Sequence, residues 1–166
     1  HETRLDAFRA SVELAKASDD PAEYEDAVAR LTDETRAAFT EMAKLRHDTA
    51  VAKVPAVVAH LTDILDGSDE KAVVFAHHHD AVAGLMEGLA AYGPVVLTGE
   101  TPMVARQAAV DRFQTDPTCR VFVGSITAAG VGLTLTAANY VAFAELTWVP
   151  GECTQAEDRC HRIGQA

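Results

Sequence analysis

Four short apolar segments, separated by helix-like stretches, constrain the fold of this chain more than any other feature. They lie at residues 72–76, 95–98, 119–125 and 140–145, and charged or turn-forming residues border them. A short apolar run with such borders is typical of a strand buried on both faces of a parallel sheet. Strands that alternate with helices predict an α/β fold with right-handed crossovers between parallel strands.

A helical segment precedes this alternating part. Residues 2–17 have an amphipathic pattern, and Asp20-Pro21 then combines an N-cap residue with one suited to the first helical turn. We expect a second helix to run from there to about His47, with its apolar residues forming an ordinary packing surface.

A third helix is predicted from about Lys53 to Leu65, ended by Asp66-Gly67-Ser68. The periodicity changes from helical to strand-like directly after it. We therefore expect two parts, a helical lead-in over residues 1–52 and an α/β body over residues 53–166. The chain of 166 residues is long enough for one domain with a substantial core.

The net charge of −11 limits how this chain could contact nucleic acid. Residues 1–70 carry 8 basic and 16 acidic side chains, whereas residues 71–166 carry 6 and 9. A general nucleic-acid binder would present a broad basic surface, because phosphates attract positive charge. Any DNA contact must therefore come from a small local surface.

The cysteines and the hydropathy indicate the cellular setting. Cys119, Cys153 and Cys160 form no close pair and fit no common zinc-ligand spacing, so we expect reduced, buried thiols and no metal site. No apolar run approaches the roughly 20 residues that cross a bilayer. The charged start at His1 lacks an initiator Met, and we expect a fragment of a cytoplasmic protein if bacterial, or a nuclear protein if eukaryotic.

Polar residues follow each predicted strand, at the point where the chain leaves the sheet. They are His77-His-His79, Thr98-Gly-Glu-Thr101, Ser125-Ile-Thr127 and the loop from Leu146 to Gly151. In an open parallel sheet, ligands bind beyond the carboxyl ends of the strands. The sequence therefore predicts one functional edge.

The strongest motif is Gln155-Ala-Glu-Asp-Arg-Cys-His-Arg-Ile-Gly-Gln165. Arg159 and Arg162 stand three apart, so a helix would place them on one face, about one turn apart. Paired guanidinium groups suit bidentate contact with phosphate oxygens, although two solvated arginines on a surface helix are the alternative for this pair alone. The full string resembles motif VI of superfamily 2 helicase-like motors, in the form found in Swi/Snf-type DNA translocases.

A second motif follows the third predicted strand, over residues 125–138. Gly130 and Gly132 allow close backbone approach, and the hydroxyls of Ser125 and Thr127 can donate to phosphate. A tight turn with packing glycines is the equal alternative. The segment resembles motif V of the same translocases, in the form of the annealing-helicase branch, and Thr127 stands where chromatin-remodelling branches usually have arginine.

Two loops extend this resemblance. Residues 71–80 resemble motif IV; the adjacent histidines invite a metal hypothesis, but no carboxylate at clear ligand spacing completes a site. We instead expect His77 and His78 to contact a DNA phosphate or a partner lobe. Trp148, with Val149 in place of the usual Asn, lies in a loop like the Trp-Asn-Pro loop that faces DNA in the family; a core position is its alternative.

The segment after the second strand resembles a further family turn. Thr101 is expected first to cap the helix that opens at Pro102, and it could also contact a DNA phosphate there together with Arg106. Thr98 and Glu100 depart from the family pattern, so the resemblance is weaker here than in the other motifs.

The resemblance covers about residues 53–166 and implies a RecA-like second lobe of a DNA-dependent ATPase. The chain has no phosphate-binding Gly-x-x-x-x-Gly-Lys loop, so ATP and Mg²⁺ would bind mainly to a first RecA-like lobe. The resemblance assigns arginine-finger roles to Arg159 and Arg162. It further implies that Gln155 and Asp158, with Gly130 and Gly132, orient these arginines or contact nucleotide.

The partners implied are that first lobe and double-stranded or forked DNA, with no membrane and no cofactor bound by this fragment itself. Fork remodelling or strand annealing, as in DNA repair, would be the outcome. The alternatives are a helicase-like docking module without catalysis and a stand-alone Rossmann-like enzyme. The absence of a Gly-x-Gly-x-x-Gly loop after the first strand argues against the latter.

Overall fold

The computed structural model describes residues 2–17, 21–125, 135–146, 151, 153–155 and 158. The chain divides into two compact units, His1–Asp48 and Thr49–Ala166. The domain boundary between residues 52 and 53 stays a prediction. In the described part of the chain, no helix has the length and apolar character needed to cross a membrane.

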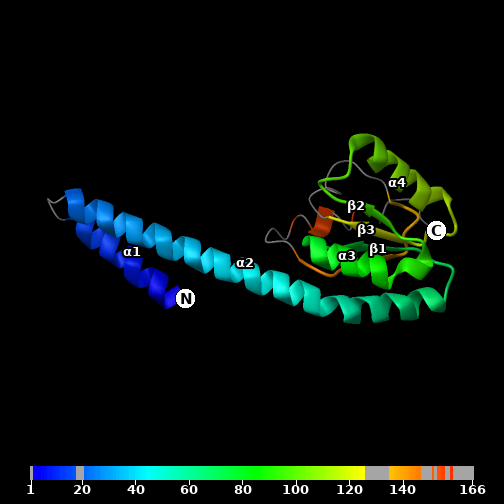
Figure 1. Cartoon of the computed structure of the whole chain (residues 1–166), viewed down its shortest axis with the longest axis horizontal. Coiled ribbons are helices and arrows are strands. Elements are labelled where there is room, and N and C mark those ends of the chain that lie inside the picture. Colours follow the sequence, from blue (N-terminus) through cyan, green and yellow to red (C-terminus); the bar gives the residue numbers. More distant parts are fainter. Residues whose placement is uncertain are drawn as a thin grey trace. The chain divides into compact units, whose positions relative to one another are not determined.

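The first unit is helical, in the order shown in Figure 1. It contains α1 (Glu2–Lys16) and the first part of α2 (Pro21–Asp66). The apolar residues predicted to form a packing surface on α2 are largely exposed. They include Phe39, Met42 and Leu45.

α2 is one continuous helix, and the prediction of separate helices ending near His47 and beginning near Lys53 is wrong. The five residues between those points include no glycine or proline that would stop a helix. Pro55 lies inside α2, where it removes one backbone hydrogen bond. Burial of Val54, Leu61 and Leu65 stabilises the helix around it.

A parallel sheet forms the centre of the second unit. Its strands are β1 (Ala72–Phe75), β2 (Val95–Leu97), β3 (Val121–Gly124) and β4 (Tyr140–Phe143), in the spatial order β2-β3-β1-β4. β1 pairs with both β3 and β4, and β2 pairs with β3. The predicted α/β fold with a parallel sheet is confirmed.

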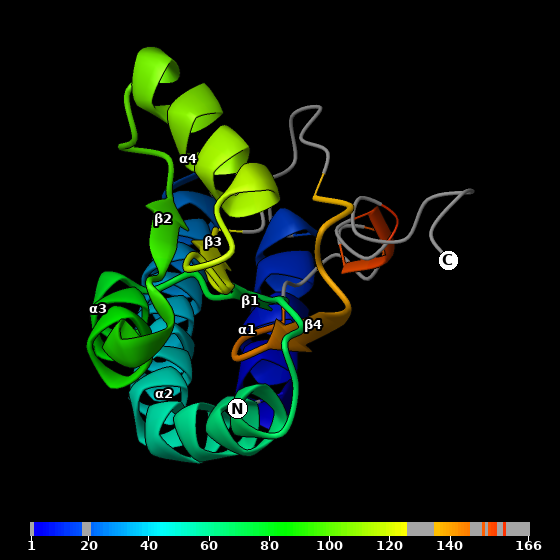
Figure 2. The ribbon, with the colours of Figure 1, turned by 90° about the vertical axis from the view of Figure 1, so that its right-hand side faces the viewer.

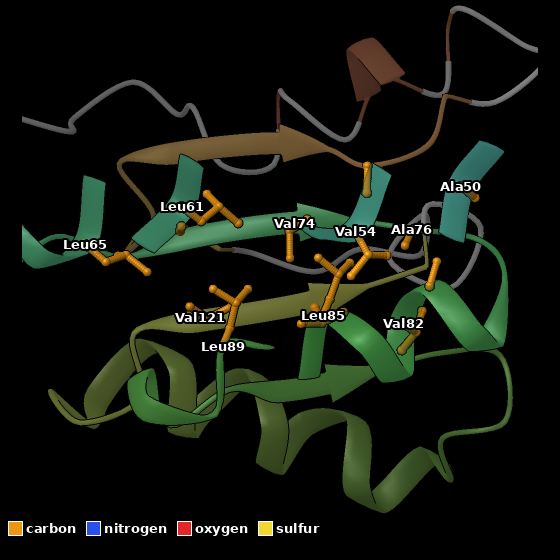
Figure 3. Packing of buried hydrophobic residues seen from close by; sticks show 14 residues of the cluster. Ala50, Val54, Leu61, Leu65, Val74, Ala76, Val82, Leu85, Leu89 and Val121 are labelled. Atoms are coloured by element: carbon orange, nitrogen blue, oxygen red, sulfur yellow. The ribbon is translucent and has the colours of Figure 1, made fainter. Parts of the chain in front are cut away.

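Helices cover both faces of this sheet. Figure 2 shows α4 (Met103–Thr115) on one face, with α3 (His79–Gly88) and the end of α2 on the other. The short helix η1 (Ala90–Tyr92) follows α3. Successive strand residues point to opposite faces, so Phe75 packs with Phe113 of α4 while Val74 packs on the other side. Figure 3 shows Leu61 and Leu85 gathered in the cluster around Val74.

Two basic side chains bind backbone carbonyls near the edge of the sheet where the strands begin. Nη2 of Arg120 donates to the carbonyl oxygens of Leu65 (2.8 Å) and Ser68 (2.6 Å), at and just past the end of α2. Nζ of Lys71 donates to the carbonyl oxygens of Phe113 (2.5 Å) and Asp116 (2.7 Å), at the end of α4. Each cation thereby satisfies carbonyls that a helix end leaves without partners.

Candidate functional site

The loops predicted to share one edge of the sheet do so. Backbone hydrogen bonds continue past the strands, from Ala76 N to the Gly124 carbonyl (3.0 Å) and from Ser125 N to the Leu97 carbonyl (2.9 Å). Ser125, a predicted DNA contact, is 7 % exposed at the end of β3. The loops that follow the described strands therefore begin on one side of the sheet, as expected when the strands are parallel.

Glu145, just beyond β4, is the most constrained polar residue at this edge. Its Oε1 accepts hydrogen bonds from the backbone N–H groups of His77 (2.9 Å) and His78 (3.0 Å). Its Oε2 lies 2.5 Å from Nδ1 of His78. The carboxylate is 6 % exposed, so one buried side chain joins the loop after β4 to the loop after β1.

Burial alone would raise the pKa of Glu145, because it disfavours the charged form. The N–H groups of His78 and His77, together with the His78 side chain, outweigh burial and lower the pKa. Glu145 is therefore a carboxylate at neutral pH.

Sequence reasoning missed Glu145, because it looked for a carboxylate close to the histidines in the chain. The partner instead comes from a segment 67 residues after His78. The available signal was a single acid at the end of an otherwise apolar strand. In the described part of the chain, no group of three His, Cys, Asp or Glu residues could hold a metal ion.

The histidines take different positions. His77 is exposed, and its ring meets the His78 ring edge-on at 5.2 Å between centroids. His79 is the first residue of α3, and its Nε2 lies 3.7 Å from Glu100 Oε1, with both side chains exposed. The loops after β1 and β2 are thus neighbours, and His77 is open to a ligand.

The prediction that Thr101 caps α4 is wrong. The N-cap is Pro102, and the Thr101 hydroxyl instead accepts a hydrogen bond from Thr98 N (2.9 Å), which closes the turn between these two residues. Arg106 holds the same turn from α4. Its Nε donates to the Thr101 carbonyl (2.9 Å) and its Nη2 donates to the Gly99 carbonyl (3.1 Å).

The remaining predicted site residues lie in the last parts of the chain or in the segments after β3 and β4. Gln155 and Asp158 are helical and exposed. The others lie outside the described residues: Arg159, Arg162, Gly130, Gly132, Thr127 and Trp148. The described edge thus brings together His77, His78, Thr101, Arg106 and Ser125.

Comparison with known proteins agrees with the motifs. Residues 53–164 match the helicase conserved C-terminal domain. The chain is 45% identical over 121 residues to the mouse DNA annealing helicase and endonuclease ZRANB3, covering 70% of this chain and 11% of that protein. It is 43% identical over 122 residues to a Caenorhabditis elegans homolog of the SWI/SNF-related regulator of chromatin subfamily A-like protein 1, covering 70% of this chain and 18% of that one.

A solved structure supports the fold. The C-terminal part of the Fun30 ATPase domain matches with a TM-score of 0.62 and 30% identity, over 68% of this chain and 37% of that one. The RecA-like α/β fold and the resemblance to Swi/Snf-type and annealing-helicase proteins are thereby confirmed. The chain spans less than a fifth of these two curated relatives, 11% and 18% of their lengths. The match over residues 53–164 means that the chain belongs to the helicase conserved C-terminal domain family.

Proposed function

We propose that this chain is the second motor lobe of a DNA-dependent ATPase that translocates on DNA. The observation that carries the proposal is the common edge at which β3 and β4 end. The segment with the motif V pattern begins there at Ser125, and the chain passes Glu145 at the same edge before reaching the motif VI pattern. In this proposal both motifs serve one ligand side, since ligands of open parallel sheets bind beyond the carboxyl ends of the strands.

The nucleotide is proposed to sit mainly on a partner lobe. In the described residues, β1 is followed by His77 and His78 rather than by a glycine-rich loop that would cradle phosphates. Mg²⁺ bound with ATP on that partner lobe would neutralise charge on the phosphates. This fragment is therefore expected neither to bind ATP tightly nor to hydrolyse it.

Arg159 and Arg162 are the proposed arginine fingers of this lobe. When the cleft between the lobes closes, their guanidinium groups would stabilise charge on the transferring phosphate, an effect of about 10³ to 10⁵ in rate in other phosphoryl-transfer enzymes. Gln155 and Asp158, which are helical and exposed, would orient them. Gly130 and Gly132 would allow the backbone to approach the nucleotide closely.

The DNA contacts are proposed to lie at the same edge and to bind the phosphate backbone without reading sequence. Exposed His77 and the turn held by Arg106 are the described parts of this surface. The full proposed set is His77, His78, Thr101, Arg106, Ser125, Thr127 and Trp148. Fork remodelling or strand annealing is the proposed outcome, with double-stranded or forked DNA as substrate.

A docking module without catalysis is the second candidate, and the net charge of −11 favours it, because an acidic lobe suits a protein partner better than DNA. It would have no use for paired arginines at the motif VI positions. Turnover of ATP decides between the two.

The test is ATP turnover by the protein that carries this lobe together with its nucleotide-binding lobe, with and without duplex and forked DNA. DNA should stimulate turnover, and Arg162→Ala should lower it by about 10³-fold. Arg30→Ala is the matched control, because Arg30 is an exposed arginine of α2 whose Nη2 lies 2.7 Å from Oδ2 of Asp26, outside the candidate site. Absence of turnover in the intact protein would support the docking module. If ATP turnover neither rises with DNA nor falls in Arg162→Ala, the motor mechanism is overturned.

A further inference from the structure

We propose that Glu145 is a positioning residue that holds the DNA-contacting turn at His77 and His78 at the end of β4. This inference rests on the proposed function, because it concerns how the same lobe binds DNA. In it, Glu145 does not touch DNA; it sets the placement of a turn that does.

The Glu145 carboxylate makes several directed contacts. Both oxygens are engaged, Oε1 with two backbone N–H groups and Oε2 with the His78 ring. Hydrogen bonds to a charged acceptor are shorter and stronger than neutral ones, and a buried charge requires them. The position of the turn at residues 77–78 is therefore defined by the position of Glu145.

These contacts continue the pairing of two strands. Among the described strands, β4 lies at the edge of the sheet and pairs with β1. Beyond the strands, Ala144 N still donates to the Phe75 carbonyl (2.9 Å), and Glu145 N lies 3.4 Å from the same oxygen. The side chain of Glu145 continues this pairing for two more residues of the β1 loop. A displacement of Glu145 would consequently be transmitted to the turn at His77 and His78.

Packing alone does not explain an acidic residue at position 145. The neighbouring position, Ala144, is buried and apolar, as is most of the core beneath it. An apolar residue at position 145 would avoid the free-energy penalty of burying a charge. The carboxylate therefore serves the placement of His77 and His78 rather than the filling of space.

The experiment uses the protein that carries both lobes and compares Glu145→Gln, His78→Ala and the double variant. Three quantities are measured: the Kd for duplex DNA, the maximal ATP turnover at saturating DNA, and the midpoint of thermal unfolding. Glu87→Gln is the matched control, because Glu87 is an exposed carboxylate of α3 that lies outside the proposed DNA-contact set. Glu145→Gln should raise the Kd about tenfold and change maximal turnover less than about twofold.

The double variant measures the coupling between Glu145 and His78 directly. If His78 acts through Glu145, adding His78→Ala to Glu145→Gln should change the Kd less than about twofold, although His78→Ala alone should raise it about threefold. Glu87→Gln should leave the Kd within about twofold.

Two results would overturn the inference. One is a lower unfolding midpoint with an unchanged Kd, which would make Glu145 a stabilising residue only. The other is full additivity of the two substitutions. If Glu145→Gln does not fold, Glu145→Asp decides, since it keeps the charge but shortens the side chain that reaches His77 N and His78 N: a raised Kd supports the inference and an unchanged Kd overturns it. An intact protein that binds DNA but does not hydrolyse ATP would refute the proposed motor and leave the Kd test of Glu145 in force.

Discussion

Arg120 and Leu65, 55 residues apart in the chain, meet where the guanidinium Nη2 donates to the Leu65 carbonyl across 2.8 Å. The same guanidinium lies over the Tyr92 ring, 5.7 Å from its centroid. Tyr92 in turn donates its hydroxyl hydrogen to Asp66 (2.6 Å). The end of α2 is thereby fixed to the start of β3 and to the residues after α3.

Replacing Arg120 should therefore destabilise the second unit. Arg120→Met would leave the carbonyls of Leu65 and Ser68 without this donor, and we expect a loss of about 2–3 kcal/mol in the free energy of unfolding. Urea denaturation measures it. Arg112→Met is the control: the exposed Arg112 side chain forms a 3.5 Å surface contact with Asp116, so a loss below about 0.5 kcal/mol is expected. Equal losses in the two variants would contradict the role assigned to Arg120.

Gly93 should not tolerate a side chain. Its φ of 60° lies in the left-handed region, and a Cβ there would lie 2.4 Å from the Thr118 carbonyl oxygen. Gly93→Ala should lower the free energy of unfolding by about 2 kcal/mol or more. At Gly99 a Cβ would have nothing within 4 Å, so Gly99→Ala should change it by less than about 0.5 kcal/mol. Thermal unfolding of both variants checks the difference, and a tolerated Gly93→Ala would refute the turn geometry.

Acid should weaken the fold through Glu145. Its pKa is lowered in the folded state, so the stability that it contributes is present above the ordinary glutamate pKa of about 4.3 and is lost as the pH falls through the lowered value. Glu145→Gln cannot be protonated and should show a smaller loss of stability between neutral pH and about pH 3. Urea denaturation at a series of pH values measures this slope. Parallel curves for the two proteins would show that Glu145 does not contribute.

Cys119 should be unreactive in the folded protein. Its side chain is fully buried, and burial raises the pKa of its thiol, so little thiolate forms. Cys153 is only partly buried. Alkylation with iodoacetamide at pH 8, mapped by mass spectrometry, should label Cys153 at least about tenfold faster than Cys119. In concentrated urea the two rates should converge. Equal rates in the native protein would contradict the burial of Cys119.

The sheet could be predicted from sequence because each strand is a compact apolar run between polar borders. The runs predicted at residues 72–76 and 140–145 contain the observed β1 and β4. The break predicted in α2 between about His47 and Lys53 was wrong, because residues 48–52 contain no glycine or proline that would end a helix. Pro55 also lies inside this helix. Buried Val54 and Leu61 hold the helix together across that position.

The loops that form the candidate site could be predicted from sequence, but the contacts between their side chains could not. A parallel topology brings the ends of β1 and β4 together, so the neighbourhood of His78 and the β4 loop follows from the fold. The pairing of Glu145 with His78 depends on strand register, and register is set by packing between segments far apart in the chain. Thr101 is a different case, because its hydroxyl makes a local contact: it accepts from Thr98 N and closes its own turn instead of capping α4.

The strand order has a consequence for synthesis of the chain. In the described sheet, β1 pairs with residues 121–124 and 140–143, both far downstream. At a ribosomal rate of about 5–20 residues per second, its apolar residues wait seconds for either neighbour. During that interval the apolar run at residues 72–76 is unpaired and uncharged, and an exposed window of this kind promotes association between copies of a chain. A chain truncated before residue 121 would make that exposure permanent.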